Sequence, residues 1–195
     1  MGETVIQVSS LGKRIKGKTI LEDISFEINK GDCVALIGPN GAGKTVLMSC
    51  ILGDKKPSSG QVLIDGKAGK AKNQIAVLLQ ENTIPNSLKV SELIAFFQAI
   101  SDNPLTNQEV QDLLQFKGDQ YQQFADKLSG GQRRLLAFVL CLIDKPKILF
   151  LDEPTAGMDT STRQRFWEIV NDLKKAGTTI LYSSHYIEEV EHTAD

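Results

Sequence analysis

The sequence has few of the residues that mark several large classes of protein. Its 195 residues include three cysteines, two histidines and one tryptophan, and 22 basic side chains nearly balance 24 acidic ones, which leaves a net charge of −2. So small a net charge gives no electrostatic footprint for general binding to nucleic acid or to a membrane surface. The longest apolar run, residues 135–143, is about half as long as a membrane-spanning helix requires. The sequence therefore indicates an ordinary globular domain with no membrane span of its own.

The cysteines exclude a disulfide framework and a zinc site. Cys33, Cys50 and Cys141 lie far apart, each among apolar residues, and none belongs to a Cys-x-x-Cys pair or has a histidine at metal-ligand spacing. We predict three buried, reduced thiols, which are typical of a cytosolic protein. The N-terminus, MGETVIQVSS, does not have the basic and apolar segments of a secretory signal.

Short apolar runs alternate with amphipathic segments along most of the chain. Continuous apolar runs, typical of buried parallel strands, occur at residues 33–38, 75–80, 147–154 and 178–185. Further strands are predicted at residues 5–8, 20–28 and 62–66. Helical spacing occurs at residues 43–52, 90–100, 106–116 and 162–177, and a last helix is predicted to start near residue 186. This alternation predicts an α/β fold with a mostly parallel sheet that is covered on both faces.

Two parts of the sequence depart from the alternation. Residues 20–28 have the pattern of a half-buried antiparallel strand, which predicts a small N-terminal antiparallel β layer. Residues 81–128 show helical patterns and no strand, so we predict an inserted helical lobe, with Ile84, Leu88, Phe96 and Phe97 mostly in its core. The predicted organisation is a single domain over residues 1–195, with a core and β layer at 1–80 and 129–195 and the helical lobe at 81–128.

The strongest motif is GPNGAGKT at residues 38–45, which matches G-x-x-x-x-G-K-[ST] between a predicted buried strand and a predicted helix. Glycines in such a loop let successive N–H groups point at phosphate oxygens, and the helix dipole adds to the attraction. Lys44 supplies a charge for the β- and γ-phosphates, and Thr45 supplies a hydroxyl for Mg²⁺. A glycine-rich turn without a ligand is the alternative. The motif predicts a P-loop NTPase core in which the nucleotide contacts are Gly38, Pro39, Asn40, Gly41, Ala42, Gly43, Lys44, Thr45 and Val46.

Two acidic residues follow the predicted buried strand ILFL. Asp152 is placed at the carboxyl end of this strand, where a carboxylate beside a phosphate loop can hold Mg²⁺, usually through water. Glu153 comes one position later, where a carboxylate can face the γ-phosphate and orient or deprotonate a water. The alternative is that both residues only begin a polar loop or cap a helix.

The segment KLSGGQRRLL, residues 127–136, places two glycines at a predicted helix start. Ser129 and Gln132 have the spacing of a capping box, which explains those two residues. It does not explain Gly130 and Gly131, because glycine costs about 1 kcal/mol relative to alanine inside a helix. Glycines at the first helical positions leave the free N–H groups uncovered, so this helix start can accept an anion in close contact.

The motifs GPNGAGKT, LSGGQ, ILFLDEP and a later SSH, in that order, resemble the nucleotide-binding domain of ABC transporters. The resemblance covers nearly the whole chain, and residues 128–132 are its most specific element. It implies ATP and Mg²⁺ as cofactors and a head-to-tail dimer, formed with a second copy or with a paired ATPase subunit, that encloses two ATP molecules. Each ATP would lie on residues 38–45 of one chain and be covered by Ser129, Gly130, Gly131 and Gln132 of the other.

The same resemblance implies roles for further residues. Gln80 matches the Q-loop glutamine that contacts Mg²⁺ and the attacking water, and His185 matches the switch histidine that contacts the γ-phosphate. The alternative for His185 is a histidine that bonds only to neighbouring backbone. Asp159 matches a D-loop residue at the dimer seam, and Ile15 stands where the family usually has an aromatic residue against adenine. The implied catalytic residues are Glu153, His185 and Gln80, and the implied metal-binding residues are Thr45, Gln80 and Asp152.

The resemblance also implies a separate membrane permease, docked near residues 82–90, and an ATPase at the cytoplasmic face of a bacterial membrane. The stretches AGMDTSTR and LSGGQRR are similar to ATPase subunits of bacterial drug and antibiotic exporters, which favours export over import. The family pattern adds further strands and a helix after the point where this sequence ends. One alternative is a soluble ABC-type ATPase that acts on nucleic acid or ribosomes, although residues 81–128 leave no room for the long coiled coil of DNA-repair members and ribosome-associated members carry two such domains. The other is a regulatory module without turnover, against which Glu153 and His185 argue.

Overall fold

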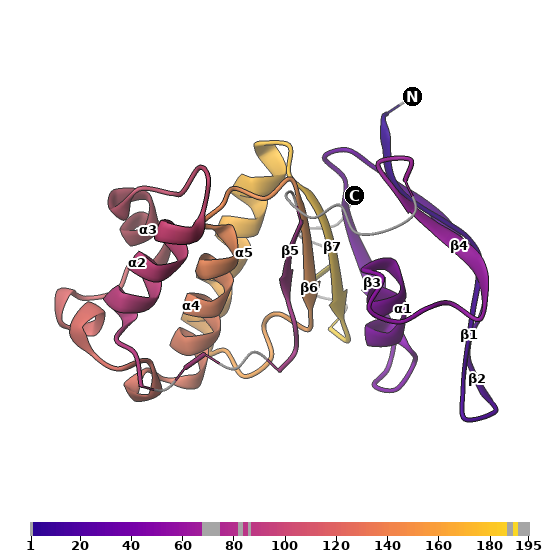
Figure 1. The fold of residues 1–195 in the computed structure, drawn as a ribbon. Helices are drawn as coiled ribbons and strands as arrows, with labels where there is room; N and C mark the ends of the chain where they lie inside the picture. Colours follow the sequence, from indigo (N-terminus) through magenta and orange to yellow (C-terminus); the bar gives the residue numbers. More distant parts are fainter. Residues whose placement is uncertain (1, 68–74, 82–83, 86, 187–188, 191–195) are drawn as a thin grey trace.

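A computed structural model describes residues 2–67, 75–81, 84–85, 87–186 and 189–190 of the chain. Its strands form two sheets, one parallel and one antiparallel, which lie side by side with helices around them (Figure 1). The last predicted helix, from residue 186, falls mostly outside the described residues, and so does His192. Among the described residues, no helix combines the length and the apolar character that a membrane span requires.

The central sheet is parallel, with its strands in the order β3-β7-β6-β5. These strands are β3 (Cys33–Ile37), β5 (Ile75–Leu78), β6 (Ile148–Asp152) and β7 (Thr179–Ser184). Successive side chains of β6 enter different cores: Leu149 and Leu151 pack on one face of the sheet, and Ile148 and Phe150 pack on the opposite face. Burial on both faces explains why the sequence of this strand is a continuous apolar run.

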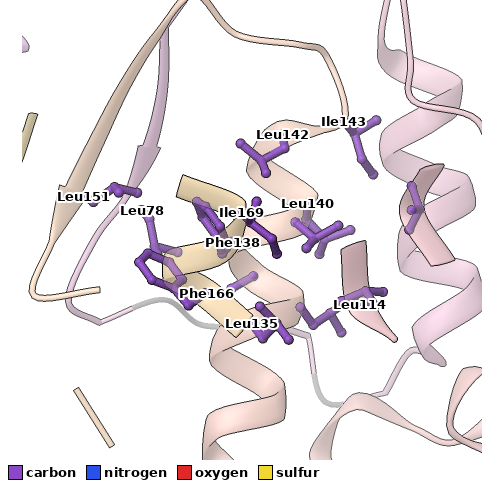
Figure 2. Packing of buried hydrophobic residues seen from close by; sticks show 14 of the residues in the cluster. Leu78, Leu114, Leu135, Phe138, Leu140, Leu142, Ile143, Leu151, Phe166 and Ile169 are labelled. Carbon is purple, nitrogen blue, oxygen red and sulfur yellow. The ribbon is translucent and has the colours of Figure 1, made fainter. Parts of the chain in front are cut away.

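Four α-helices lie on one side of the parallel sheet (Figure 1). They are α2 (Val90–Ile100), α3 (Asn107–Leu114), α4 (Gly130–Leu142) and α5 (Thr160–Lys175), with short 3₁₀ turns at Gly118–Gln122 and Ala125–Lys127. Figure 2 shows Phe138 of α4, Leu78 of the sheet and Phe166 of α5 in this core, and the rings of Phe138 and Phe166 lie 4.3 Å apart. Burying such a side chain contributes about 1.5–3 kcal/mol, so this core holds α4 firmly against the ends of the strands.

The antiparallel sheet has the order β2-β1-β4 and, with helix α1 (Lys44–Ile51), encloses a second core against the other face of the parallel sheet. Its strands are β1 (Thr4–Ile15), β2 (Lys18–Asn29) and β4 (Ser59–Ile64). The strand predicted at residues 5–8 is too short, because the pairing of β1 with β2 shifts register between Val8 and Leu11 and Ser10 has a φ of 45°. Such a bulge interrupts the period-two pattern by which a strand is found in a sequence.

The segment at residues 81–128, predicted as a helical lobe, contains α2, α3 and the two 3₁₀ turns. Its described residues include no strand, and their only β pairing is an isolated bridge between Lys89 and Phe124. The capping box predicted at Thr106 and Glu109 is confirmed. Two core predictions are wrong in part. Phe96 is 56% exposed, because it lies on the outer side of α2, and Cys141 is half-buried, unlike Cys33 and Cys50.

Candidate functional site

The loop of residues 38–43 joins β3 to α1 and turns on two glycines in left-handed conformation. Gly41 has a φ of 83° and Gly43 a φ of 97°, which side chains other than glycine rarely adopt. At Gly43 an added Cβ would also lie 3.0 Å from Cδ2 of Leu21. Gly43 caps α1 without a side chain, so the first N–H groups of the helix have neither a side-chain cap nor an acceptor within the helix.

A cavity of 410 Å³ lies at this helix start. Its described lining comes from the loop, from the start of α1, and from Gln80 and Glu153, which follow β5 and β6. The carboxyl ends of three parallel strands therefore contribute to one site, which is where ligands bind in open α/β sheets. The lining residues are Ile20, Asn40, Gly41, Gly43, Lys44, Thr45, Val46, Gln80 and Glu153.

The Glu153 carboxylate lies between two basic side chains, those of Lys44 and His185. Its Oε1 is 3.5 Å from Nζ of Lys44, and its Oε2 is 3.5 Å from Nδ1 of His185. The ammonium of Lys44 also donates to the carbonyl oxygens of Gly38 and Pro39, at 2.7 Å and 3.2 Å. The side chains of Lys44 and Glu153 are only 9% and 12% exposed, so water screens their attraction little. A carboxylate held in this way can accept a proton from a bound water.

A second group of oxygens lies one residue earlier on β6. The Thr45 hydroxyl donates to Oδ2 of Asp152 at 2.7 Å, and the Ser183 hydroxyl donates to Oδ1 at 2.6 Å. A hydroxyl and a carboxylate are the hard oxygen ligands that Mg²⁺ prefers, and Mg²⁺ commonly takes only one or two of them from protein and the rest from water and phosphates. The described residues hold no cluster of three or more metal-ligating side chains. The donors therefore fit a Mg²⁺ ion that arrives with a phosphate.

Glu153 has a φ of 43°, a left-handed conformation that costs a non-glycine residue about 1 kcal/mol or more. Its N–H donates to the Ser183 hydroxyl at 2.8 Å, and its carbonyl accepts a hydrogen bond from Arg134. The surrounding structure thus fixes the strained backbone, and with it the direction of the carboxylate. Strain of this kind concentrates at functional sites.

Two residues near the site are easily overlooked in the sequence. Ile20 lines the cavity from β2, whereas Ile15 is half-buried near the β1–β2 turn and is not among the described lining residues. Nothing in the sequence marks Ile20 as a site residue, since it has the pattern of an ordinary strand residue. Arg134 does carry a signal, because a charge four residues before Phe138 falls on the buried stripe of α4, where a charge needs a strong reason.

The segment at residues 129–132 begins α4 with a closed capping box, as predicted. The Ser129 hydroxyl accepts from the N–H of Gln132 at 3.2 Å, and Oε1 of Gln132 accepts from the N–H of Ser129 at 3.1 Å. The two glycines between them differ. An added Cβ at Gly130 would meet nothing within 4 Å, but at Gly131 it would lie 3.2 Å from Oδ2 of Asp159. Packing within the chain is thus a sufficient reason for glycine at position 131, without any bound anion.

Asp159 lies beside this segment and caps α5. Its Oδ1 accepts hydrogen bonds from the Thr162 N–H at 3.0 Å and from the Ser161 hydroxyl at 2.7 Å, and these bonds hold the pKa of the Asp159 carboxyl well below its usual range. Residues 129–132 and Asp159 therefore share one surface. None of them is among the described lining residues of the cavity at α1. Gln80 and Glu153 line that cavity directly. Asp152 lies beside it through its hydrogen bond with Thr45, and His185 lies beside it through its contact with Glu153.

A comparison with protein-family models gives a match over residues 21–156, to the family described as ABC transporter. The matched segment is well over half of the 195 residues. The chain belongs to the ABC transporter family. This membership and the P-loop fold are as the sequence motifs predict.

Several ABC transporter ATP-binding proteins are similar to the chain over almost all of its length. The Nod factor export ATP-binding protein I of Ralstonia nicotianae is 34% identical and covers 98% of the chain. The linearmycin resistance ATP-binding protein LnrL of Bacillus subtilis is 33% identical over the same share. The chain spans 62% and 64% of the lengths of these two relatives. A solved ATP-binding subunit of an ABC transporter, 26% identical, matches the fold with a TM-score of 0.83 over 98% of this chain and 84% of that one.

Proposed function

We propose that the chain is the ATP-hydrolysing subunit of an ABC transporter and that it drives export through a membrane permease on a separate polypeptide. The observation that supports this most strongly is the arrangement of Lys44, Thr45, Asp152, Glu153 and His185 around one helix start. Together these groups have what phosphoryl transfer to water requires: cationic and N–H contacts for phosphate, hard oxygens for a metal, and a base for water.

Phosphate binding falls to the loop and to the start of α1. The N–H groups of residues 40–46 and the Lys44 ammonium bind the β- and γ-phosphates, which compete for that ammonium with the carbonyls of Gly38 and Pro39. Thr45 and Asp152, with Gln80, hold Mg²⁺, which when bound neutralises charge on the phosphates. The adenine ring rests on aliphatic surface, with Ile20 added to the predicted contact at Ile15.

The water that attacks the γ-phosphate is oriented by Glu153, with His185 and Gln80. Glu153 accepts the proton from this water, because its carboxylate already lies in the cavity and beside the imidazole of His185. Lys44 and the loop N–H groups stabilise the charge that develops on the phosphoryl oxygens. The low exposure of Lys44 and Glu153 makes each of these interactions stronger than it would be at the surface.

We propose that the functional unit is a head-to-tail dimer, made with a second copy or with a paired ATPase subunit. In this arrangement, Ser129 to Gln132 of one chain cover the ATP bound at Lys44 of the other. Two features support it: Ser129 and Gly130 are exposed, and the segment lies outside the cavity of its own chain. Asp159, adjacent to Gly131, then lies at the dimer seam.

Export is proposed because one relative is named for Nod factor export and another for resistance to linearmycin. The permease docks on the lobe at the cytoplasmic face of the membrane. Predicted docking residues 82, 83 and 86 lie outside the described part of the chain, and described Ile84 is buried. Phe96 and Ile100 of α2, which are 56% and 64% exposed, are apolar candidates for part of this contact.

The variant Glu153→Gln tests the proposal. It removes the base but keeps the shape of the side chain, so we expect turnover to fall on the order of 100-fold or more while ATP affinity changes little. Steady-state phosphate release and equilibrium binding of ATP measure the two effects, and gel filtration with ATP should show a trapped dimer. Glu3→Gln is the control, because Glu3 pairs with Lys30 in an exposed ion pair remote from the site. Wild-type turnover by Glu153→Gln would refute the assigned base, and a monomer at saturating ATP would refute the dimer.

A further inference from the structure

We propose that Arg134 is a positioning residue that fixes the two backbone segments from which Gln80 and Glu153 reach the nucleotide cavity. The proposal rests on the ATPase function proposed above. Arg134 lies in the second turn of α4, four residues after Gly130 and on the side of the helix that packs against the sheet. Arg134 is not itself among the described lining residues of the cavity, and its hydrogen bonds reach only main-chain carbonyls, so it acts through other residues.

All hydrogen-bond donors of the Arg134 guanidinium point at main-chain carbonyl oxygens. One terminal nitrogen donates to the carbonyls of Leu79 and Gln80, and its distance to the carbonyl oxygen of Gln80 is 3.1 Å. The other terminal nitrogen donates to the carbonyls of Asp152 and Glu153, at 3.0 Å and 3.3 Å, and Nε donates to the carbonyl of Pro154 at 3.0 Å. An arginine side chain has five N–H donors in a rigid fork, so each donor has an acceptor.

The five carbonyls belong to only two segments, the ends of β5 and of β6. These are the points at which the chain leaves the parallel sheet and turns to the cavity, at Gln80 and at Glu153. A single planar group therefore fixes the distance and the angle between the two segments. One of the bonds is to Glu153 itself, whose left-handed φ of 43° needs such support.

The burial of Arg134 indicates that its hydrogen bonds to the two segments offset the free-energy cost of removing a charge from water. The residue is 9% exposed, and burial lowers the pKa of its guanidinium. Removing a charge from water is unfavourable unless hydrogen bonds replace the lost hydration. Leucine or methionine would fill the same space in the core of α4 without that cost. The charged side chain is explained if the five carbonyls must be held in one place.

Arg165 of α5 provides a matched control. Its Nε donates to the carbonyl of Leu113 at 3.1 Å, and a terminal nitrogen donates to the carbonyl of Asp112, so it also ties a helix to main-chain carbonyls. These carbonyls end α3, in the lobe, and none of the residues involved lines the nucleotide cavity. Arg165→Met therefore also removes arginine bonds to main-chain carbonyls, together with an ion pair to Glu168, but does not affect the carbonyls of Gln80 and Glu153.

The test compares Arg134→Met, Arg134→Lys and Arg165→Met with the wild type, by steady-state ATP hydrolysis at a temperature well below every Tm. We expect Arg134→Met to lower kcat by at least about tenfold with a KM for ATP within about threefold, since misplaced catalytic groups slow the chemical step more than binding. The kcat of Arg134→Lys should lie between those of the wild type and Arg134→Met, because an ammonium has three donors and lacks the planar geometry of a guanidinium. Arg165→Met should lower Tm and leave kcat unchanged.

A second measurement separates positioning from simple support of the fold. If Arg134 acts through Gln80, then Gln80→Ala should lower kcat by a smaller factor in the Arg134→Met background than in the wild type. An equal factor in both backgrounds would overturn the proposal, and so would wild-type kcat in Arg134→Met or an equal loss of kcat in Arg165→Met. If Arg134→Met does not fold, unchanged kcat in Arg134→Lys overturns it instead. A wild type without ATP hydrolysis would refute the proposed function, and this inference with it, whereas an active wild type matched by Arg134→Met refutes the inference alone.

Discussion

Two helices of this protein begin with glycine-rich segments, and the two starts are built differently. The start of α1 has Gly43 in left-handed conformation, no side-chain cap, and a cavity lined by Lys44 and Glu153. The start of α4 has a complete capping box between Ser129 and Gln132 and lies on an exposed surface. The glycines of α1 are required by the shape of the loop itself. At α4, only one glycine of two is required by packing in the chain, and Gly130 is not.

The difference indicates which groups each helix start can contribute to a site that is proposed to lie between two chains. A helix start can bind an anion through its free N–H groups. At α1 the same chain adds a cation, a hydroxyl and a carboxylate around that start, so the site is nearly complete. At α4 the Asp159 carboxylate lies beside Gly131, and the start is not part of the cavity of its own chain, so the exposed Gly130 would meet an anion only if another molecule brought it. The dimer proposal follows from this asymmetry.

The largest expected effect comes from blocking the start of α4. Ser129→Arg places a long cation where the partner's γ-phosphate is proposed to lie, so we expect hydrolysis to fall on the order of 100-fold or more. ATP binding to the isolated chain should be unchanged, because the segment is not part of that chain's own cavity. Steady-state hydrolysis and equilibrium binding at low protein concentration measure the two effects.

The control for Ser129→Arg is Thr106→Arg, which removes a capping box of the same kind from α3. A lost N-cap costs about 1 kcal/mol of stability in either place, so the control accounts for that loss. If Ser129→Arg abolished ATP binding by the monomer, the segment would belong to its own chain's site and the contrast between the two helix starts would fail. Equal loss of hydrolysis in both variants would attribute the effect to stability.

The contrast also shows which parts could be predicted from the sequence. The α1 site depends on residues that are adjacent in a motif and on strand ends that the apolar runs already reveal, so Lys44, Thr45, Asp152 and Glu153 could be brought together in advance. The reason for Gly131 could not, because it depends on contact with Asp159, which is distant in sequence. Contacts between segments far apart in the chain leave no local pattern.

The same limit applies to the rest of the fold. Buried strands and capped helices were predictable because their patterns are local, and so were the helices α2 and α3. The length of β1 was not, since its bulge near Ser10 breaks the alternation on which such a prediction depends. Nor could a sequence show that Phe96 faces outward or that Ile20 reaches the cavity, because both depend on how the elements pack.

A smaller effect is expected from substitution at the α1 start. Gly43→Ala must adopt a φ near 97° and bring a Cβ to 3.0 Å from Leu21, so we expect a loss of about 1–2 kcal/mol in the free energy of unfolding. The loop should also lose the geometry that binds phosphate, which lowers ATP affinity. Urea denaturation and equilibrium ATP binding measure these effects. A variant of wild-type stability and affinity would show that the loop does not need its left-handed turn.

The smallest effect concerns the two glycines of α4 and compares them with each other. Gly130→Ala adds a Cβ in open space at a helical position, so we expect the free energy of unfolding to rise by about 0.5 kcal/mol. Gly131→Ala brings a Cβ to 3.4 Å from Cα of Met158, a backbone atom that cannot easily move, so it should be about 1 kcal/mol less stable than Gly130→Ala. Urea denaturation of both variants measures the difference.

Turnover by Gly130→Ala then decides why that glycine is present. If its N–H contacts the partner's phosphate, the added methyl group should slow hydrolysis even though the chain is more stable, which a purely structural role does not allow. A variant that is more stable and equally active would leave Gly130 without a function in the dimer. Because the stability change has the opposite sign to the expected activity change, this result cannot arise from unfolding, and it tests the proposed half-site at α4 independently of Ser129.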